Sequence, residues 1–208
     1  LHDGHKQAFN AGNLLRGYWE LGKNPRFMLL ALASGIPFNG MFLYVLSAPV
    51  FLGEHLALGP GEFFWFFCLT IGGIIGGAWL SGRLAGRIRP KDQIRRGFVI
   101  MIAVSLVNVA LNYFFEAHAW WAMWPIAIFG FGWSLMVPVV TLMVLDLVPE
   151  RRGMASSMQA CVGSLANGVV AGVIAPLVMH STLHLAIASV AMLSIGVVAW
   201  IWVKPRVP

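Results

Sequence analysis

The chain has 208 residues, of which 59% are hydrophobic and only 11% are charged, and its net charge is +6. Soluble domains carry about 25% charged residues, so this balance excludes an ordinary soluble enzyme or binding module. The positions of the basic residues along the chain explain the positive charge without nucleic acid. We therefore predict a lipid bilayer as partner and no nucleic-acid role.

Residues 1–26 precede the first long apolar stretch and are predicted to be a cytoplasmic linker. They are polar at first and then mix apolar and charged side chains: Leu14, Leu15, Arg16, Tyr18, Trp19, Glu20, Leu21 and Lys23. This pattern predicts a short amphipathic helix at the membrane interface, acting as a tether and anchor, with a regulatory linker as the alternative. Because the chain opens on Leu1 rather than Met, we expect a fragment or a processed form.

Six uncharged stretches follow, and each is long enough to cross the ~30 Å hydrocarbon core, which takes roughly 20 helical residues. They are residues 27–52, 63–82, 97–115, 120–145, 153–179 and 182–203. Uninterrupted apolar segments of this length must form their backbone hydrogen bonds internally, as helices. The sequence therefore predicts an all-α integral membrane protein, with a six-helix transmembrane bundle over residues 27–208.

The loops between these stretches alternate in charge. All 14 Lys and Arg lie before the first stretch, in the second and fourth loops, or after the last stretch. The other loops carry Glu54, Glu62, Glu116 and His residues but no Lys or Arg. The positive-inside rule then places both termini in the cytoplasm, in a multi-pass protein of the cell (inner) membrane.

The stretches also contain a weak internal repeat. Pro37 and Pro49 in the first correspond to Pro125 and Pro138 in the fourth, and the second and fifth are both rich in Gly. Such correspondence is typical of inverted repeats, here three helices plus three helices. Small residues spaced by four let helix backbones approach closely, inside this bundle or against a second one. The predicted helix-packing residues are Gly72, Gly73, Gly76, Gly77, Gly168 and Gly172.

The interior of the stretches lacks ionisable side chains. An ionisable residue inside the membrane is the first candidate for proton coupling, so we expect the proton-carrying residue to lie elsewhere. The His residues fall in loops or near helix ends, which leaves a buried Ser–His pair without its base, and we predict no enzyme. Cys68 and Cys161 have no metal-ligand or disulfide spacing, so neither a metal site nor a cofactor is predicted.

Uncharged polar and aromatic residues are then the candidates for a substrate cavity. Methionines add adaptable surface, as at Met136 and Met143. Each candidate is also a residue type that makes ordinary interhelical contacts. The candidates are Asn39, Phe42, Tyr44, Phe66, Phe67, Trp133, Thr141, Met158, Gln159 and Asn167.

Two segments resemble a known family. Residues 24–52, NPRFMLLALASGIPFNGMFLYVLSAPVFL, followed by GGIIGGAWLSGRLAGRI at 72–88, look like the start of the second half of a major facilitator superfamily drug:proton antiporter of the Bcr/CflA-like group. Residues 149–177 resemble that group's eleventh helix. The resemblance covers essentially the whole chain. It implies helices seven to twelve, the C-terminal half of such a transporter.

The resemblance carries further expectations. It implies that two six-helix bundles rock about a midplane site, with the first and fourth helices here lining the cavity, the second and fifth facing the partner bundle, and the third and sixth facing lipid. It also implies that the proton-coupling acid belongs to the N-terminal half, which is then a required partner.

Residues 77–88 resemble the superfamily's cytoplasmic loop motif, with Arg83, Gly86 and Arg87 in place and Gly82 where an Asp is expected. In the family this motif latches the two halves together. Topogenic anchoring by the same charges is the alternative.

The predicted function is proton-coupled efflux of small hydrophobic or amphipathic compounds, of the multidrug-resistance type, driven by the proton gradient. An importer of sugars or metabolites is the first alternative, but it would need more placed donors and acceptors than Asn39, Gln159 and Asn167 supply. A non-transport scaffold subunit is the second. A homodimer of this half-size unit would lack a buried acid and act as a facilitator or use another driving force.

Overall fold

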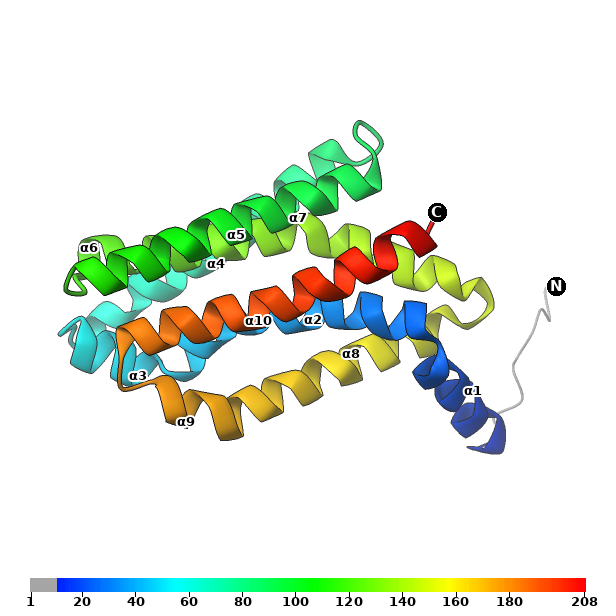
Figure 1. Cartoon of the computed structure of the whole chain (residues 1–208), viewed down its shortest axis with the longest axis horizontal. Helices are drawn as coiled ribbons and strands as arrows, with labels where there is room; N and C mark the ends of the chain where they lie inside the picture. The colour runs from blue at the N-terminus through cyan, green and yellow to red at the C-terminus, as the bar shows by residue number, and fades with distance from the viewer. Residues whose placement is uncertain (1–10) are drawn as a thin grey trace.

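The computed structural model describes residues 11–208, and every regular element in that part of the chain is a helix. Residues 1–10, the polar start of the expected linker, lie outside the described residues. Six helices of the described part are long and apolar enough to cross a membrane. They lie alongside one another in a single bundle (Figure 1), which confirms the predicted all-α, six-helix architecture.

The helices are, in chain order, α1 (Ala11–Lys23), α2 (Pro25–Leu46), α3 (Ala48–Val50), α4 (Phe63–Leu84), α5 (Pro90–Phe114), α6 (Ala119–Ala122), α7 (Trp124–Leu147), α8 (Arg152–Val169), α9 (Ala175–Val178) and α10 (Thr182–Val203). Short turns extend or join them: π-helical η1 (Phe51–His55) and η4 (Val170–Ile174), and 3₁₀ turns η2 (Pro60–Glu62), η3 (Pro149–Arg151) and η5 (Lys204–Arg206). The third crossing begins at Pro90, seven residues before the expected start of its uncharged stretch.

Proline explains where the crossings are interrupted. The first crossing breaks at Ser47, just before Pro49, and the fourth breaks at Met123, just before Pro125. Proline has no backbone N–H and its ring collides with the carbonyl four residues earlier, so a regular helix cannot continue through it unchanged. Pro37 instead stays within α2, where Gly196 of α10 leaves room for its ring.

Helices α2 and α7 form the centre of the bundle. α8 and α10 pack against α2, α4 and α5 pack against α7, and the two central helices contact each other. The first helix of each set of three thus packs on the second and third helices of the other set, as inverted repeats would do. α5 and α10 also meet and close one side.

Burial is uneven among the six crossings. The apolar window of α2 is 56% buried, whereas that of α4 is 17% buried and that of the α8–α9 crossing is 11% buried. The open face of α4 carries Phe64, Trp65 and Ile75, and the open face of α8 and η4 carries Leu165 and Val173. These two crossings therefore leave the largest apolar faces uncovered by the chain itself.

Glycine sets the close contact between α4 and α7. A Cβ on Gly73 would overlap the carbonyl oxygen of Ala127, and one on Gly77 would overlap that of Phe131. Gly72, on the next face of α4, has nothing within 4 Å of such a Cβ. Only one side of the glycine-rich segment is therefore used for packing within the bundle.

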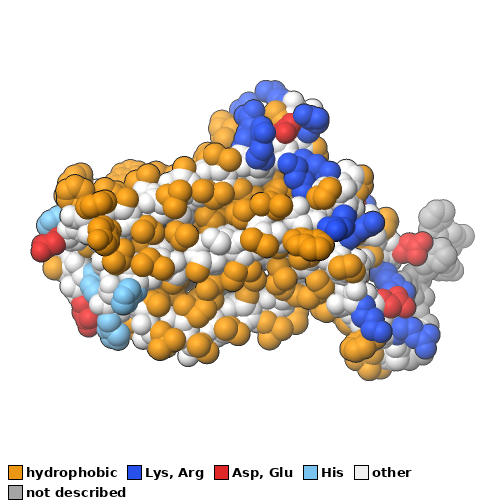
Figure 2. Space-filling view, viewed as in Figure 1, with side chains coloured by type: hydrophobic (Ala, Val, Ile, Leu, Met, Phe, Trp, Pro, Cys, Tyr) orange, Lys and Arg blue, Asp and Glu red, His pale blue; other side chains and the backbone are white. Residues whose placement is uncertain are grey.

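Charged side chains gather at one end of the bundle, which we call the basic end. It comprises the α4–α5 loop, the α7–α8 loop and the C-terminal residues Lys204 and Arg206. Figure 2 shows Lys and Arg at this end, with some acidic side chains among them, and His and further acidic side chains but no Lys or Arg at the opposite end. α1 lies beside the basic end (Figure 1), where Glu20 pairs with Arg151 at 2.5 Å.

Candidate functional site

A cluster of polar and aromatic side chains joins the two central helices to α8, and we call it the α2–α7–α8 cluster. Four of its members are residues that the sequence predicted as cavity candidates: Phe42 of α2, Trp133 and Thr141 of α7, and Gln159 of α8. The members are Ser34, Phe38 and Phe42 of α2, Trp133 and Thr141 of α7, and Gln159 of α8. All but Ser34 remain partly exposed.

Hydrogen bonds fix the polar part of the cluster. The indole Nε1 of Trp133 donates to the backbone carbonyl of Ser34 at 2.9 Å. The side-chain amide of Gln159 donates to Ser34 Oγ at 3.1 Å and to Thr141 Oγ1 at 3.3 Å. Since both contacts use Nε2, the carbonyl oxygen of Gln159 has no hydrogen-bond partner among residues 11–208. It is the free acceptor of the cluster.

Aromatic rings extend the cluster along α2. Phe38 lies against the Trp133 ring, with the ring centroids 4.8 Å apart, and stacks on Phe42 at 5.3 Å. Ser34, Phe38 and Phe42 recur every four residues and therefore share one face of the helix. Partly exposed aromatic faces bind apolar surface by dispersion and attract cations through the ring quadrupole.

Two further residues of α8, Gly163 and Asn167, follow Gln159 at four-residue steps and so share its face of that helix. A Cβ on Gly35 of α2 would come within 3.3 Å of Gly163 Cα, so the two backbones approach closely one turn beyond Gln159. Gly163 therefore serves as a packing partner for α2. Asn167, one turn further, has a buried Oδ1 with no hydrogen-bond partner among residues 11–208.

Tyr44 lies away from the cluster. Its hydroxyl accepts a hydrogen bond from Asn108 Nδ2 of α5 at 2.9 Å, and Asn112 in turn donates to Asn108 Oδ1 at 2.9 Å. Tyr44 and Asn108 are both buried. The side chain that the sequence placed among the cavity candidates thus ties α2 to α5.

The remaining candidates are also dispersed. Phe66 is fully buried against Phe51, and Phe67 packs against Phe66. Asn39 is buried and donates to Gly35 O within its own helix at 3.3 Å. Met158 lies beside Gly22 of α1. Met136 is buried against Gly97 of α5, and Met143 lines a cavity of about 460 Å³ at the basic end.

The loop expected to carry the cytoplasmic motif is a turn at the basic end. Gly86 has φ +78°, a conformation that glycine adopts without steric cost. Arg83 lies over the Trp79 ring, 5.0 Å from its centroid, and has no acidic partner among residues 11–208. Arg87 is exposed. Neither arginine is held by an acid within the bundle, so both are free to meet one outside it.

Sequence reasoning missed Ser34 and Phe38. Ser34 is small and resembles a packing residue, and Phe38 is one of 14 phenylalanines. Their four-residue spacing with Phe42 is the signal that could have identified them, because it places all three on one helix face.

Comparison with known proteins agrees with this architecture. Residues 3–171 match the Major Facilitator Superfamily. The chain is 24% identical over 195 residues to "Multidrug resistance protein D" of Escherichia coli (strain K12), a match that covers 93% of the chain and 48% of that protein. It is 26% identical over 168 residues to "Uncharacterized MFS-type transporter YdgK" of Bacillus subtilis (strain 168), covering 80% of the chain and 40% of that protein. The chain thus spans about half the length of the curated relatives it matches.

Proposed function

The chain belongs to the Major Facilitator Superfamily, a family of membrane transporters rather than enzymes, and we propose that it is the C-terminal six-helix half of a proton-coupled exporter of small hydrophobic or amphipathic compounds. The α2–α7–α8 cluster is the proposed substrate contact. The observation that carries this assignment is the partly exposed Trp133–Phe38 pair beside the free carbonyl of Gln159, on the central helices. The similarity to a protein named for multidrug resistance supports the choice of substrate class.

The uncovered faces support a second six-helix half. α4 and the α8–α9 crossing flank the central pair and are the least buried crossings. Gly72, Gly168 and Gly172 lie on them with nothing within 4 Å of an added Cβ, so the backbones are accessible to another helix. A partner half packed there would enclose the α2–α7–α8 cluster between two bundles, where alternating access operates.

The distribution of charge supports a proton site in that partner half. Among residues 11–208, no Asp, Glu, Lys, Arg or His side chain is buried. A proton carrier inside the membrane must be a titratable group, and such groups are costly enough to be kept only where they function. We therefore assign substrate contact to this half and proton transfer to the other.

The chemistry of the cluster favours an apolar or amphipathic substrate over a sugar. Recognition of a sugar needs several donors and acceptors aimed into the site. Here both donor contacts of Gln159 are used within the protein, and so is the indole N–H of Trp133. The surface that remains is mainly aromatic, with the free acceptor of Gln159 and the Thr141 hydroxyl as its polar groups, which are few for a sugar.

The orientation follows from the basic end. Lys and Arg in short loops favour the cytoplasmic side, so we place the basic end and both termini there, in the inner membrane. In this orientation Arg83, Gly86 and Arg87 face the cytoplasm. There the two arginines can pair with acidic groups of the partner half and hold the two halves together while the transporter is closed on the cytoplasmic side.

The test is efflux of ethidium, an amphipathic fluorescent cation, from energised vesicles that contain the full-length protein. We expect efflux that starts when a proton gradient is imposed and stops when an uncoupler collapses it. At an equal protein level, vesicles that contain the Trp133→Ala protein should show slower ethidium efflux. Gradient-insensitive efflux would rule out proton coupling. If ethidium is not transported and sugar uptake is driven by the gradient, the exporter hypothesis is wrong and the importer hypothesis is favoured.

A further inference from the structure

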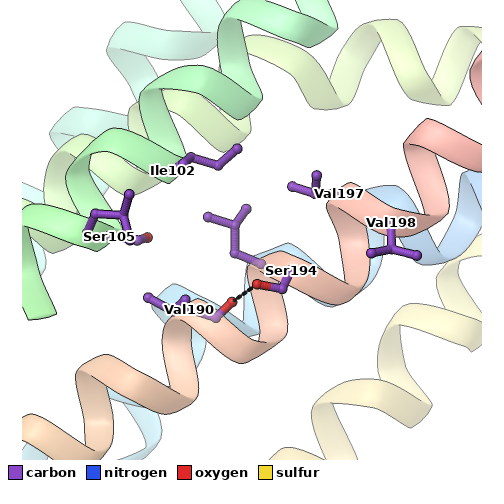
Figure 3. Close-up of a pocket in the computed structure, with 8 residues that line it drawn as sticks. Ile102, Ser105, Val190, Ser194, Val197 and Val198 are labelled. Carbon is purple, nitrogen blue, oxygen red and sulfur yellow. Dashed lines mark hydrogen bonds between the residues drawn. The ribbon is translucent and has the colours of Figure 1, made fainter.

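A groove of about 300 Å³ runs between α5 and α10, on the opposite side of α2 and α7 from the flanking faces of α4 and α8. Figure 3 shows Ile102 and Ser105 of α5 facing Val190 and Val197 of α10 across it. Leu106 and Val198 at its margins are each 58% exposed, so the groove opens on the outer surface of the bundle. Because the chain spans a membrane, this surface faces the hydrocarbon of the bilayer.

The wall of the groove is apolar except for two serines. Ser194 Oγ donates to the backbone carbonyl of Val190 at 2.8 Å and is therefore satisfied within its own helix (Figure 3). Ser105 is 4% exposed, and its Oγ has no hydrogen-bond partner among residues 11–208. An unpaired hydroxyl buried in an apolar wall costs free energy that a hydrogen bond would recover.

The depth of Ser105 distinguishes the kind of ligand that would pair with it. It lies fifteen residues after Pro90 and nine before Phe114 within α5, well inside the span of the helix. The headgroups of lipids lie at the two surfaces of the bilayer, and their acyl chains carry no hydrogen-bonding group at this depth. On the side of the groove, a partner for Ser105 must therefore be a polar atom on a molecule that is otherwise dissolved in the hydrocarbon.

We propose that the α5–α10 groove is a second binding site, which takes an uncharged apolar molecule from the bilayer and pairs its single hydrogen-bond acceptor with Ser105 Oγ. The site is distinct from the α2–α7–α8 cluster, since the central helices lie between the two. It does not depend on transport or on a partner half. A volume of about 300 Å³ lies at the lower end of the range for small-molecule pockets, which suits a ligand of one or two rings.

Photolabelling with benzophenone tests the proposal. Benzophenone is an uncharged ketone that dissolves in lipid, and under ultraviolet light its carbonyl carbon bonds to a nearby C–H carbon, while the carbonyl becomes a hydroxyl with the abstracted hydrogen. The full-length protein is labelled in phospholipid vesicles and mapped by peptide mass spectrometry. We expect saturable labelling on residues 102–106 and 190–198, which diphenylmethane, of similar shape but without the oxygen, displaces only weakly.

Two alanine variants separate the proposed hydrogen bond from mere apolar filling. Ser105→Ala should lower labelling of the groove about fivefold at sub-saturating probe, because it removes one net hydrogen bond. Ser194→Ala removes a hydroxyl from the same groove that is already satisfied, and should label as the unaltered protein does. Both substitutions shorten a side chain by one oxygen, so monodisperse elution of each variant is the check on folding.

Three results would overturn the proposal. Labelling spread evenly over all lipid-facing helices, without saturation, would show that the groove has no preference for the probe. Equal labelling of the two variants would show that Ser105 does not recognise the ketone, and that its hydroxyl is paired inside the bundle, where it also borders a cavity of about 10 Å³ beside Tyr44 and Asn108. Full displacement by diphenylmethane would show that the ketone oxygen is not recognised and that the groove is only an apolar cleft, suited to a lipid acyl chain. Because efflux is not measured, failure here leaves the proposed transport untouched.

Discussion

The indole N–H of Trp133 donates to the backbone carbonyl of Ser34 at 2.9 Å, and this contact joins the two central helices at the level of the candidate site. In membrane helices such a bond is worth about 0.6 kcal/mol on average, so it orients the ring more than it holds the bundle together. The bond engages one edge of the indole, and the ring lies against Phe38 at an interplanar angle of 44°. Position and exposure of the ring are thereby set before any substrate arrives.

Two substitutions of Trp133 should weaken substrate binding to different extents. Trp133→Phe keeps a ring beside Phe38 but loses the bond to Ser34, and we expect the half-maximal ethidium concentration for efflux to rise about two- to tenfold. Trp133→Ala also loses the aromatic contact, and its effect should be larger. Trp124→Phe, at an exposed position of the same helix, is the matched control. Equal behaviour of Trp133→Phe and Trp124→Phe would contradict the assignment.

Removing the amide of Gln159 should affect affinity while the bundle stays intact. Gln159→Leu deletes the contacts to Ser34 Oγ and Thr141 Oγ1 and the free acceptor, yet the position is partly exposed, so the cost to folding is small. We expect the KM for efflux to rise several-fold with little change in thermal stability. Ser157→Ala on the same helix, which loses only a bond to Gly153, should change neither quantity. A large drop in stability would instead mark Gln159 as a structural residue.

Tyr44 should behave in the opposite way. Tyr44→Phe leaves Asn108 Nδ2 buried without its partner, and a loss of about 1 kcal/mol would lower the melting temperature by about 2–4 °C in a chain of this size. The KM for efflux should stay unchanged, because the hydroxyl faces α5. Tyr113→Phe, 68% exposed, provides the comparison. A raised KM with normal stability would return Tyr44 to the substrate site.

The contrast between Gln159 and Tyr44 shows what the sequence could and could not predict. Uncharged stretches and basic loops identified six crossings, because length and charge alone determine which segments can enter the bilayer. The rotation of each helix was harder to derive, since lipid and protein interior are both apolar and leave little periodicity to read. Gln159 and Trp133 were placed among the candidates by residue type, and so was Tyr44, which faces another helix.

Glycine spacing had the same limitation. Gly72 and Gly73 are adjacent and equally suited to close packing in sequence, yet only Gly73 meets the backbone of α7. The sequence predicted that these glycines pack helices and left open whether they do so within the bundle or against another. The structure separates them into one set that contacts α7 and another that faces outward.

The contact between α1 and the bundle should depend more on packing than on its ion pair. Glu20 and Arg151 have side chains that are 53% and 38% exposed, and exposed pairs contribute only about 0–1 kcal/mol. Glu20→Gln should therefore leave α1 in place. Gly17→Leu inserts a side chain where Met154 now lies, and should displace α1 from α8. The rate of trypsin cleavage after Lys23 in the folded protein measures displacement of α1 from α8. We expect faster cleavage for Gly17→Leu and an unchanged rate for Glu20→Gln. The reverse ranking would mean that the ion pair holds the helix.

Adding a methyl group to the glycines of α4 should separate the inward and outward sets. Gly77→Ala places a carbon against the carbonyl oxygen of Phe131 and within 2.7 Å of Ser134 Oγ, and the backbone of α7 cannot move as a side-chain end could. Overpacking of this kind costs about 1–3 kcal/mol, which corresponds to a melting temperature lower by about 2–12 °C. Gly76→Ala, at the preceding residue, is the matched control, because the nearest neighbour of its added carbon is the Phe131 ring at 3.5 Å.

The outward set should respond only when another helix is present. A Cβ at Gly172 would meet nothing within 4 Å in this bundle, and the position is exposed, so we expect Gly172→Leu not to lower the thermal stability of the isolated chain. If the second six-helix half packs on the α8–α9 crossing, the same variant should reduce co-purification of the two halves, since a leucine would hold the backbones apart. Val198→Leu, a change at another exposed position on the α5–α10 side, should leave co-purification intact. Full assembly by Gly172→Leu would show that the partner half does not approach this part of the crossing.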